Sequence, residues 1–335
     1  MKSIKLGIVG LGRFAKLHLQ CFRQLPNVKV VAVCDLNQEL AETTAHAWNA
    51  KAYTDWREML DAEELDVVDV LTPEFAHAEP VAAALQAGCH VFVEKPLALK
   101  ATVAAELIRL AELKHRVLVT GHVCRFDPRY IQVKEKIAKG AFGRLRSIYA
   151  RRNNGKAFFS IYRRANPVYI LGIHDLDLMH WFTGQKVVEV YTQAPPNEAG
   201  DHDLVYAMLR FEDGTIGVIE NNWLLPSQAP AYMDVSMEIV GELATAHLNE
   251  PDASLVIWDD ERAVAPPVIS SSEIYERLTG PLFEELRHFT ECVLTNEPSK
   301  IVRPEDALQA VEVAEAVVRS LELGKPVNPS QLGEL

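Results

Sequence analysis

The sequence predicts an α/β protein in two parts: a doubly wound parallel sheet, then an α+β domain built on a large, open, mostly antiparallel sheet. Three observations support this class. Nearly continuous apolar runs alternate with helical patterns through the first third of the 335 residues. A glycine-rich turn follows the first of these runs. Beyond residue 121 the expected strands become longer and alternate apolar with polar residues. We therefore expect one domain over residues 1–122 and a second over residues 123–335, with the C-terminal helix able to pack back on the first.

The strands expected in the first part are short and apolar on both faces, which is typical of a parallel sheet covered by helices on either side. They are Leu6–Val9, Val28–Cys34, Val67–Leu71, His90–Val93 and Val117–Thr120. Helical patterns separate them, at Phe14–Gln24, Gln38–Trp48, Ala76–Ala87 and Thr102–Lys114. Strand–helix–strand repetition of this kind indicates a doubly wound domain.

The strands expected in the second part alternate in polarity, which is typical of an antiparallel sheet with one solvated face. After a helix at Arg129–Lys139 they are Leu145–Arg152, Val187–Gln193, Leu204–Phe211, Thr215–Trp223, Met233–Val240 and Ala244–Leu248. Glu212-Asp213-Gly214 is expected to form a hairpin turn, because an Asp-Gly pair tolerates positive φ angles. Two helices are expected to close the chain, Leu282–Leu294 and Pro304–Leu323, the second with Pro in its first turn and Gly324 just after its end.

The composition is that of an ordinary globular protein, 48% hydrophobic and 24% charged. The formal net charge of −12 argues against nucleic acid or an anionic membrane as the main partner. A phosphate-bearing ligand stays compatible with this charge, because a helix N-terminus and a few local cations can bind one.

Cysteine usage indicates a reducing compartment. The chain has 5 cysteines, an odd number, and none forms a Cys-x-x-Cys pair. We expect reduced thiols in a cytoplasmic protein. The start, MKSIKLGIVGLG, is too short and glycine-broken for a signal peptide, and no apolar run is long enough to cross a bilayer.

The turn after the first expected strand has the pattern G-x-G-x-x-A, from Gly10 to Ala15. Gly10 allows the tight turn, Gly12 allows a pyrophosphate to approach the backbone, and Ala15 allows the helix to pack closely on the strand. The helix N-terminus then faces the anion. Its position in the first strand–turn–helix unit favours a dinucleotide site, although glycines also occur in purely structural turns.

Asp35 ends the second expected strand, about 20 residues beyond the motif, where a carboxylate receives the ribose hydroxyls of a dinucleotide. It would repel a 2′-phosphate, and the following Leu36-Asn37 supplies no cation to offset that repulsion. NAD is therefore favoured over NADP. Asp35 could also act as an N-cap of the next helix, and the two roles are compatible.

The segment VFVEKP, Val91 to Pro96, ends an apolar strand with an acid, a base and a proline. The carboxyl end of a parallel strand is where open α/β sheets bind their ligands. A Lys beside an apolar cofactor pocket can have its pKa lowered, so that Lys95 could donate or accept a proton near neutral pH. The alternative is an edge strand protected against aggregation by charge and proline. Pro96 restricts Lys95, and the bond between them could be cis.

Together these segments resemble the glucose–fructose oxidoreductase / inositol dehydrogenase / rhizopine-catabolism family. The ordered set that carries the resemblance is the glycine turn, TPEFAH at residues 72–77, Ala87-Gly88, Glu94-Lys95-Pro96, GHVCRFDP at residues 121–128 and GIHDLD at residues 172–177. It covers most of the chain. The resemblance implies a Rossmann domain joined to an open sheet that carries the substrate and packs against another subunit, in a homodimer or homotetramer.

The resemblance also implies hydride transfer between a nicotinamide and a carbinol carbon of a sugar or cyclitol. Lys95, after which the family usually has a cis bond, would then move the hydroxyl proton, and His174 would contact the same oxygen. The cofactor-binding residues it implies, together with the glycine turn and Asp35, are Gly10, Gly12, Arg13, Phe14, Asp35, Thr72, Pro73, His77, Glu94 and Lys95. The substrate-binding residues are Lys95, Arg125, Tyr169, His174 and Asp175.

The segment from Tyr169 to His180 is expected to enter a helix, with His174 and Asp177 on one face and Asp175 about 100° away. Alone, His174 is more often a satisfied polar residue than a catalyst. The sequence departs from the family at Ile170, where many relatives carry an Asp four residues before this His. Either Lys95 and His174 suffice, or Asp175 or Asp177 replaces the missing carboxylate, or the chemistry differs.

Several further residues have open alternatives. Arg125 could orient substrate or cofactor, or form an interdomain ion pair. The arginines at 151, 152, 163 and 164 could bind an anionic substrate, or form a solvated face or a subunit contact. Trp223 could stack on a sugar ring or pack in the core. We expect no metal site, because His174, Asp177 and His180 lack a recognised ligand spacing.

These inferences converge on a cytoplasmic, NAD-dependent oxidoreductase acting on a sugar, cyclitol or sugar derivative. Two alternatives share the same motifs. One is a nonoxidative glycosidase that retains NAD as a transient oxidant. The other is a catalytically silent regulator that binds NAD and a sugar, which the residue Ile170 favours and the intact Glu94-Lys95-Pro96 disfavours.

Overall fold

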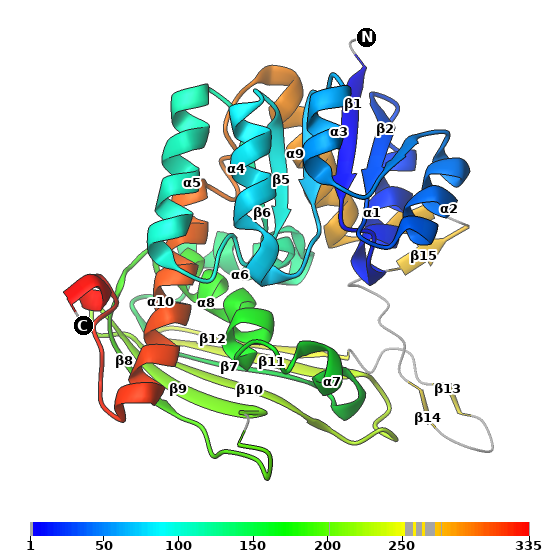
Figure 1. The fold of residues 1–335 in the computed structure, drawn as a ribbon. Helices are drawn as coiled ribbons and strands as arrows, with labels where there is room; N and C mark the ends of the chain where they lie inside the picture. The colour runs from blue at the N-terminus through cyan, green and yellow to red at the C-terminus, as the bar shows by residue number, and fades with distance from the viewer. Residues whose placement is uncertain are drawn as a thin grey trace. The chain divides into compact units, whose positions relative to one another are not determined.

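The computed structural model describes residues 3–200, 202–251, 257–258, 263–264, 272–275 and 277–334 (Figure 1). The chain forms two compact units. The first contains Met1–Phe126 and Ser271–Leu308, and the second contains Asp127–Ser270 and Gln309–Leu335. The chain therefore returns to the first unit after the second has begun: Ser271–Leu308, expected in the second domain apart from a C-terminal helix able to pack back, belong to the first unit.

The first unit is built on a six-stranded sheet with the order β3-β2-β1-β4-β5-β6, in which every pairing is parallel. The predicted doubly wound fold class is confirmed. The strands are β1 (Ile4–Val9), β2 (Val28–Cys34), β3 (Lys51–Tyr53), β4 (Val67–Val70), β5 (His90–Glu94) and β6 (Leu118–Gly121). All four residues of β4 are buried, because helices cover the sheet on both faces.

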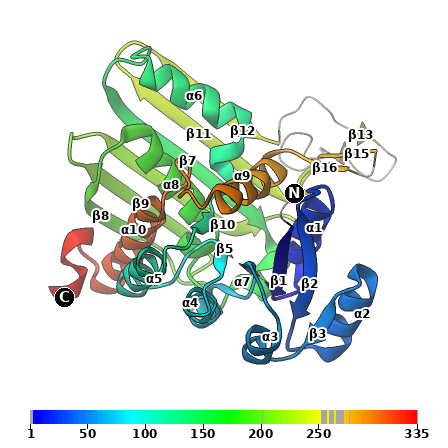
Figure 2. The same ribbon diagram turned by 90° about the horizontal axis from the view of Figure 1, so that it is seen from above.

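The helices of this unit fall into two layers. Helices α1 and α9 lie side by side on one face of the sheet, and α3, α4 and α5 lie on the other (Figure 2). Their bounds are α1 (Arg13–Arg23), α2 (Gln38–Trp48), α3 (Trp56–Ala62), α4 (Ala78–Gln86), α5 (Ala101–Lys114) and α9 (Pro281–Thr295), with short 3₁₀ turns η1 (Glu74–Ala76) and η2 (Val123–Phe126). Strand β3 and helix α3 were absent from the sequence prediction.

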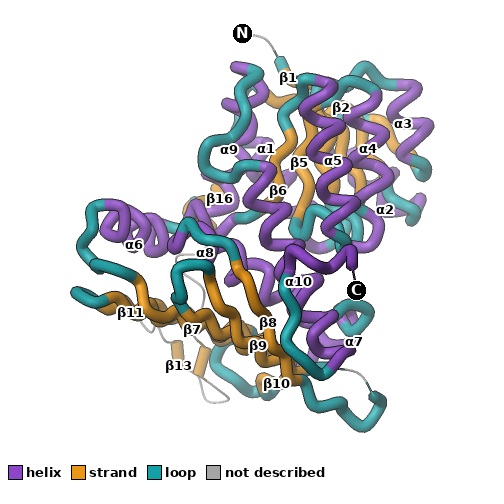
Figure 3. Tube along the Cα trace, turned by 90° about the vertical axis from the view of Figure 1, so that its left-hand side faces the viewer, coloured by secondary structure: helices purple, strands orange, loops and turns teal. Residues whose placement is uncertain are grey.

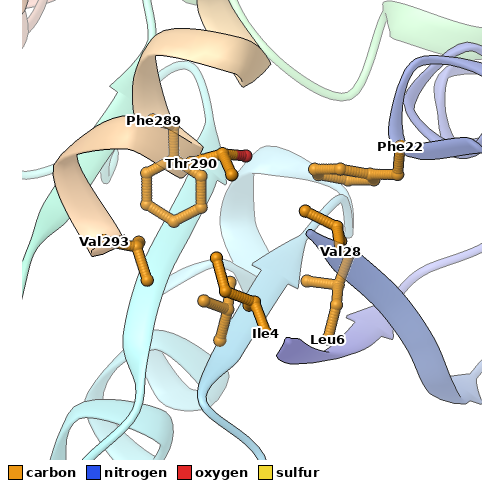
Figure 4. A pocket seen from close by; sticks show the side chains of 8 residues that line it. Ile4, Leu6, Phe22, Val28, Phe289, Thr290 and Val293 are labelled. Carbon is orange, nitrogen blue, oxygen red and sulfur yellow. The ribbon is translucent and has the colours of Figure 1, made fainter. Parts of the chain in front are cut away.

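Helix α9 completes the core of the first unit. Its residue Phe289 is 1% exposed and packs edge-on against Phe92 of β5, with ring centroids 5.4 Å apart. A small apolar cavity of about 10 Å³ lies between this helix and strands β1, β2 and β4, bordered by Ile4, Val28 and Val293 among others (Figure 4). The cavity is of the size of a single water, so it is a packing defect of the core rather than a ligand site.

The second unit is built on a six-stranded sheet with the order β12-β11-β7-β10-β9-β8. Strands β7 and β10 pair in parallel and all the other neighbours are antiparallel, so the predicted mostly antiparallel sheet is confirmed. Gly214, at φ 86°, lies in the predicted hairpin turn between β9 and β10. The bounds are β7 (Leu145–Gly155), β8 (Val187–Gln193), β9 (Leu204–Phe211), β10 (Ile216–Leu225), β11 (Met233–Gly241) and β12 (Thr245–Glu250).

One face of this sheet is covered and the other is exposed. Helices α6 (Pro128–Ala138) and α8 (Ile173–Thr183) lie on the same side of the sheet (Figure 3). The strands alternate accordingly, and β9 places Val205, Ala207 and Leu209 in the core and Tyr206 and Met208 in solvent.

The remaining elements are short, except for the last helix. They are η3 (Lys156–Phe158), α7 (Phe159–Tyr162), η4 (Val168–Gly172), the two-residue strands β13 (Ile257–Trp258) and β14 (Ala263–Val264), the strands β15 (Ser272–Ile274) and β16 (Arg277–Thr279), helix α10 (Pro304–Leu323) and η5 (Pro329–Glu334). Helix α10 is uninterrupted, as the sequence predicted, and its residues as far as Leu308 belong to the first unit.

The packing of α9 predicts a large stability effect at Phe289. Replacement of Phe289 by Ala removes a fully buried ring and should lower the free energy of unfolding by about 3–5 kcal/mol. Urea denaturation followed by circular dichroism measures this change. Leu294→Ala is the matched control, because Leu294 lies on the same helix but is 42% exposed. Equal losses in the two variants would show that α9 does not contribute to the core as described.

Candidate active site

The glycine turn after β1 has the geometry that a dinucleotide requires. Gly10 has φ 94°, and a Cβ there would lie 2.7 Å from the carbonyl carbon of Leu71 and 2.8 Å from the amide nitrogen of Thr72. No side chain is possible at such distances, so glycine lets the turn pass directly beside the end of β4. The Gly10 amide donates to the carbonyl of Cys34 at 2.8 Å, which ties the turn to the end of β2.

The N-terminus of α1 is open above this turn. Gly12 is the N-cap, no side chain caps the helix, and a Cβ built on Gly12 would meet nothing within 4 Å. Arg13 and Phe14 are exposed in the first helical turn, while Ala15 is buried against the sheet. The chain thus leaves space and backbone N–H groups where a pyrophosphate binds in this kind of fold, so these residues fit the cofactor.

Asp35 is held in a fixed orientation at the end of β2. One carboxylate oxygen accepts the Leu11 amide at 2.8 Å, and the other accepts the Asn37 amide at 2.9 Å. The carboxylate is half-buried and keeps unused lone pairs for further donors. The helix N-cap is Asn37, whose side chain accepts from the Leu40 amide, so the alternative role for Asp35 as N-cap of α2 is wrong.

His77 joins the loops that follow β4 and β5. One ring nitrogen lies 2.7 Å from the carbonyl oxygen of Pro96, and the other lies 2.9 Å from that of Thr72. Burial lowers the pKa of His77, and the two carbonyl oxygens oppose that shift. Because a neutral ring carries one N–H, it satisfies one of these carbonyl oxygens as a donor. Thr72 itself donates to the carbonyl of Ala76 at 3.1 Å, and Pro73 precedes η1.

Glu94, Lys95 and Pro96 stand at the carboxyl end of β5, as predicted, and the Lys95–Pro96 bond is cis. Glu94 and Lys95 are half-buried, and the Lys95 amide donates to the Glu94 carboxylate at 3.2 Å. A Cβ on Gly121, in the neighbouring strand β6, would lie 2.7 Å from that carboxylate. Glycine at this position is therefore what gives the Glu94 side chain its room.

In the second unit, the predicted helix begins with a π-helical turn, η4, which runs directly into α8. Wide turns of this type occur frequently at functional sites. In this protein Tyr169 and Ile170, within η4, are buried, and His174, in the first turn of α8, is half-buried. Gly172 permits the turn to approach β10, because a Cβ there would lie 2.4 Å from the Asn221 side-chain oxygen.

Asp175 points to a buried arginine. Its carboxylate accepts two forked hydrogen bonds from Arg152 of β7, the shorter at 2.8 Å, and Arg152 and Asp175 are both buried. Burial raises the pKa of Asp175, and the guanidinium of Arg152 opposes the shift. Arg152 was predicted only as one member of a basic cluster, and the bidentate pair assigns it a structural contact. Asp177 is also buried.

The structure also shows the contacts of Trp223 and Arg125, for which the sequence left alternatives open. Trp223 is buried, with Tyr162 stacked on its indole at a centroid distance of 5.2 Å, so it packs in the core rather than offering a face to a sugar. Arg125 is buried and donates to the Ile301 carbonyl at 2.7 Å and to Asp306 at 2.8 Å. Asp306 belongs to the first unit as Arg125 does, so this ion pair is not interdomain. A contact of Arg125 with substrate stays a prediction.

Within the described ranges, no group of three or more His, Cys, Asp and Glu side chains is arranged to hold a metal ion. Among those same residues, none of the helices combines the length and the apolar character that crossing a membrane requires.

Comparison with known proteins agrees with this geometry. Residues 4–122 match the model of an oxidoreductase family with an NAD-binding Rossmann fold, and residues 130–247 match the model of the GFO/IDH/MocA C-terminal domain. The two segments together make up more than half of the chain. The protein belongs to this family. The predicted resemblance, the Rossmann domain and the NAD cofactor are thereby confirmed.

Relatives of this family member match along nearly its whole length. The uncharacterized oxidoreductase YrbE of Bacillus subtilis is 29% identical, in an alignment that covers 98% of this chain and 97% of YrbE. The myo-inositol 2-dehydrogenase of Thermotoga maritima is 27% identical, in an alignment that covers 95% of this chain and 96% of that enzyme. The structure of scyllo-inositol dehydrogenase from Lactobacillus casei with NAD(H) and scyllo-inositol has a TM-score of 0.85 at 23% identity, covering 98% of this chain and all (100%) of its own. At that identity the likeness establishes the fold alone.

The fixed carboxylate at residue 35 predicts the cofactor preference of this oxidoreductase. If Asp35 receives the ribose hydroxyls as predicted, Asp35→Ala removes charged hydrogen bonds to the ribose, and NAD affinity should fall by about 10–100-fold. Isothermal titration with NAD measures the change. Asn37→Ala is the control, because it removes the cap of α2 two residues away and should leave NAD affinity nearly unchanged. An unaltered dissociation constant in Asp35→Ala would exclude the ribose contact.

The buried Arg152–Asp175 pair predicts an asymmetric mutational pattern. Arg152→Met leaves the Asp175 carboxylate buried without its cation and should lower the free energy of unfolding by about 3–5 kcal/mol. The double variant Arg152→Met/Asp175→Leu removes both charges and should recover most of that loss, as thermal and urea unfolding would report. If the double variant is no more stable than the single one, the pair does not carry this energy.

Proposed function

We propose that this protein is an NAD-dependent dehydrogenase that transfers a hydride between the nicotinamide and a carbinol carbon of a cyclitol, sugar or sugar derivative. The observation that carries the proposal is the position of Glu94-Lys95-Pro96. It ends a strand of the same parallel sheet whose first strand ends in the glycine turn. A dinucleotide bound along that edge of the sheet would bring its nicotinamide ring toward Lys95.

In this proposal the first unit binds and orients the cofactor. The backbone from Gly10 to Phe14 receives the pyrophosphate, and Asp35 receives the adenosine ribose hydroxyls. Thr72, Pro73 and His77 line the nicotinamide half, and Glu94 lies near the nicotinamide ribose. When bound, NAD supplies the hydride acceptor, so the protein has to supply binding, orientation and proton transfer.

Lys95 is the proposed proton carrier. Oxidation of an alcohol releases a hydroxyl proton as the hydride leaves, and a lysine near an apolar site can have its pKa tuned to accept it. His174, from the second unit, is proposed to hydrogen-bond the same oxygen. We propose that these two side chains converge on the carbinol, and that Arg125, Tyr169 and Asp175 contribute to substrate binding.

The substrate class rests on the relatives and on the composition of the second unit. Several of the relatives are named inositol 2-dehydrogenases, which supports a cyclitol. Ile170 stands where many family members have an acid, and it packs in an apolar cluster with Leu171 and Trp223. We therefore propose a substrate related to inositol, rather than inositol bound with the usual carboxylate.

We further propose that the protein works in the cytoplasm as a homodimer or homotetramer. None of the five cysteines, all of which lie in the described part of the chain, forms a disulfide, which suits a reducing compartment. The exposed face of the second sheet carries Tyr191, Tyr206 and Met208, the kind of apolar and aromatic side chains that a second copy would bury. Light scattering at several protein concentrations tests the assembly.

The function is tested by assaying a panel of cyclitols, sugars and sugar acids for NADH formation at 340 nm. Reduction of NAD with at least one of them supports the dehydrogenase. Cleavage of a glycoside with no net NADH would indicate a nonoxidative enzyme. Binding of NAD and sugar with neither reaction would indicate a regulator, and mass spectrometry of the native and denatured protein shows whether cofactor is retained.

The role of Lys95 predicts a separation of catalysis from binding. Lys95→Ala should lower turnover by about 10²–10⁴-fold, because acid–base catalysis is lost while the pyrophosphate and ribose contacts remain. Steady-state kinetics and NAD titration measure both quantities. Lys100→Ala is the control, since Lys100 is exposed five residues along the same segment. Wild-type turnover in Lys95→Ala would rule out the assigned role.

A further inference from the structure

A histidine is buried between two carboxylates beneath the cofactor edge of the first sheet. His18 of α1 and Asp69 of β4 are both fully buried, at 0% exposure. The His18 Nδ1 lies 2.9 Å from one Asp69 oxygen, and its Nε2 lies 3.5 Å from one Glu94 oxygen. The first distance is a hydrogen bond, and the second is an ion pair rather than an optimal hydrogen bond. None of the site residues discussed above explains why an apolar core holds these groups.

The geometry decides how the ring is protonated. A neutral imidazole has one N–H and one lone pair. With the proton on Nδ1, the lone pair would face the Glu94 carboxylate, and with the proton on Nε2 it would face Asp69. With Asp69 and Glu94 both ionised, only the imidazolium directs an N–H at each carboxylate. A cation between two acids also leaves the cluster with a net charge of −1 rather than −2, which lowers the cost of burying it.

The surroundings contain little else that could compensate these charges. Phe14, Phe22 and Phe92 lie around the ring, with centroids 5.3, 6.2 and 5.5 Å from that of His18. Further titratable groups of this core are Cys21, on the same helix, and Glu285 and Cys292 of α9. Burial alone lowers the pKa of His18, but the charge and hydrogen bond of Asp69, with a smaller part from Glu94, raise it to about 10. Burial also raises the pKa of Asp69, and the charge and hydrogen bond of His18 oppose that shift, so each ionised partner stabilises the charge of the other.

The third member of the cluster connects it to the proposed active site. Glu94 is half-buried, and its other oxygen accepts the amide of Lys95 at 3.2 Å. The buried oxygen that faces His18 is also the one that the missing side chain of Gly121 makes room for. His18 and Gly121 therefore define together where the Glu94 carboxylate lies.

We propose that His18 and Asp69 are positioning residues: Asp69 keeps His18 protonated, and the imidazolium fixes the Glu94 carboxylate and offsets part of its charge. The effect on the cofactor rests on the proposed function, in which Glu94 lies near the nicotinamide ribose. The nicotinamide ring is cationic in NAD⁺ and neutral in NADH. An uncompensated carboxylate nearby would favour NAD⁺, so the imidazolium shifts the balance of binding toward NADH.

The protonation state is tested without any cofactor. In cofactor-free protein labelled with ¹⁵N-histidine, nuclear magnetic resonance should show both ring nitrogens of His18 protonated at pH 7 and still protonated at pH 8. In Asp69→Asn the nearest counter-charge is lost, and the ring should become neutral at a lower pH than in wild type. A wild-type ring that is neutral at pH 7 would overturn the proposal, and this measurement requires no variant to fold.

The same state predicts the pH dependence of stability. Because the pKa of His18 is about 10 in the folded protein and 6.5 for the free side chain, the folded state binds the extra proton between these values. The contribution of His18 is complete below pH 6.5 and is lost as the pH rises toward 10. The unfolding free energy of wild type should therefore fall more steeply from pH 6.5 to pH 8.5 than that of Asp69→Asn. Equal slopes would contradict the role of Asp69.

The proposed effect of His18 on the cofactor is tested by comparing the dissociation constants of NADH and NAD⁺. His18→Gln removes the imidazolium and keeps a polar side chain, and the buried Asp69 should then take up a proton while Glu94 stays ionised. The net charge of the cluster stays at −1, but Glu94 loses the cation 3.5 Å from it, whereas the neutralised Asp69 lies on the far side of the ring. We expect the ratio Kd(NADH)/Kd(NAD⁺) to rise by about two- to threefold, less than a full charge interaction would give. Fluorescence titration of NADH, alone and in competition with NAD⁺, measures both constants.

The control for that experiment is His90→Leu. His90 lies at the opposite end of β5, where its Nδ1 accepts the amide of Val117 at 3.0 Å. This variant loses a part-buried hydrogen bond but should leave the ratio unchanged, which separates a specific charge effect from general destabilisation. An unchanged ratio in His18→Gln overturns the proposed effect on the cofactor. If wild type binds neither nucleotide, the proposed function fails, while the resonance measurement still decides the state of His18.

Discussion

The carboxyl edge of the first sheet is the constraint on which the cofactor site depends. Strands β2, β1, β4 and β5 are adjacent and parallel, so the four loops that follow them leave the sheet at one edge. Gly10, Asp35, Thr72 and Glu94 occupy those loops although the first and last are 84 positions apart in the chain. The loops after β1 and β4 can lie this close together only because residue 10 is glycine, since a Cβ there would overlap the peptide group of Leu71. The hydrogen bond from Leu11 to Asp35 then ties two of the loops together.

Three buried ion pairs stand out in the described part of the chain. His18 with Asp69, Arg125 with Asp306, and Arg152 with Asp175 each join elements that are distant in sequence. Such pairs add little net stability, because the cost of desolvating both ions cancels much of their attraction. They do fix geometry, since a buried ion that loses its partner is strongly unfavourable. Each pair lies beside a segment predicted to serve function: Glu94-Lys95, the 121–128 segment, and the helix that begins near His174.

The sequence predicted well what depends on local pattern. The strands of the first sheet are continuous apolar runs, and α2, β8, β9 and α10 have the bounds expected from periodicity and caps. It missed β3 and α3, because β3 is a three-residue strand at the edge of the sheet with no apolar run. The Asp55 cap of α3, which accepts from the Arg57 amide, was a signal that could have revealed that helix. The sequence also did not predict that β7 and β10 pair in parallel. Hydrophobic periodicity indicates which residues form a strand but not which strands become neighbours.

The same distinction holds for the site. A few consecutive residues are enough to recognise the glycine turn, Asp35 and Glu94-Lys95-Pro96, so sequence motifs can identify them. The His18–Asp69 contact spans 51 residues and belongs to no motif. A signal was nevertheless present: the apolar face of α1 includes His18 between Ala15 and Phe22, and Asp69 interrupts the run Val67-Val68-Asp69-Val70. Polar residues in positions that the pattern assigns to the core must find each other, because isolated burial is too costly.

The second unit shows how the substrate side can change while the fold is kept. Tyr169 and Ile170 are held by the π-helical turn, and Ile170 packs on Leu171 and Trp223 rather than on a polar group. Asp175, one of the two acids that could replace the missing carboxylate, already accepts a forked pair of hydrogen bonds from Arg152. Asp175 can therefore not take over the part of the missing acid without breaking its ion pair, and Asp177, the other candidate, is buried. In the proposed reaction Lys95 then carries the proton while His174 hydrogen-bonds the same oxygen, and the apolar cluster around Ile170 helps to determine which cyclitol or sugar is accepted.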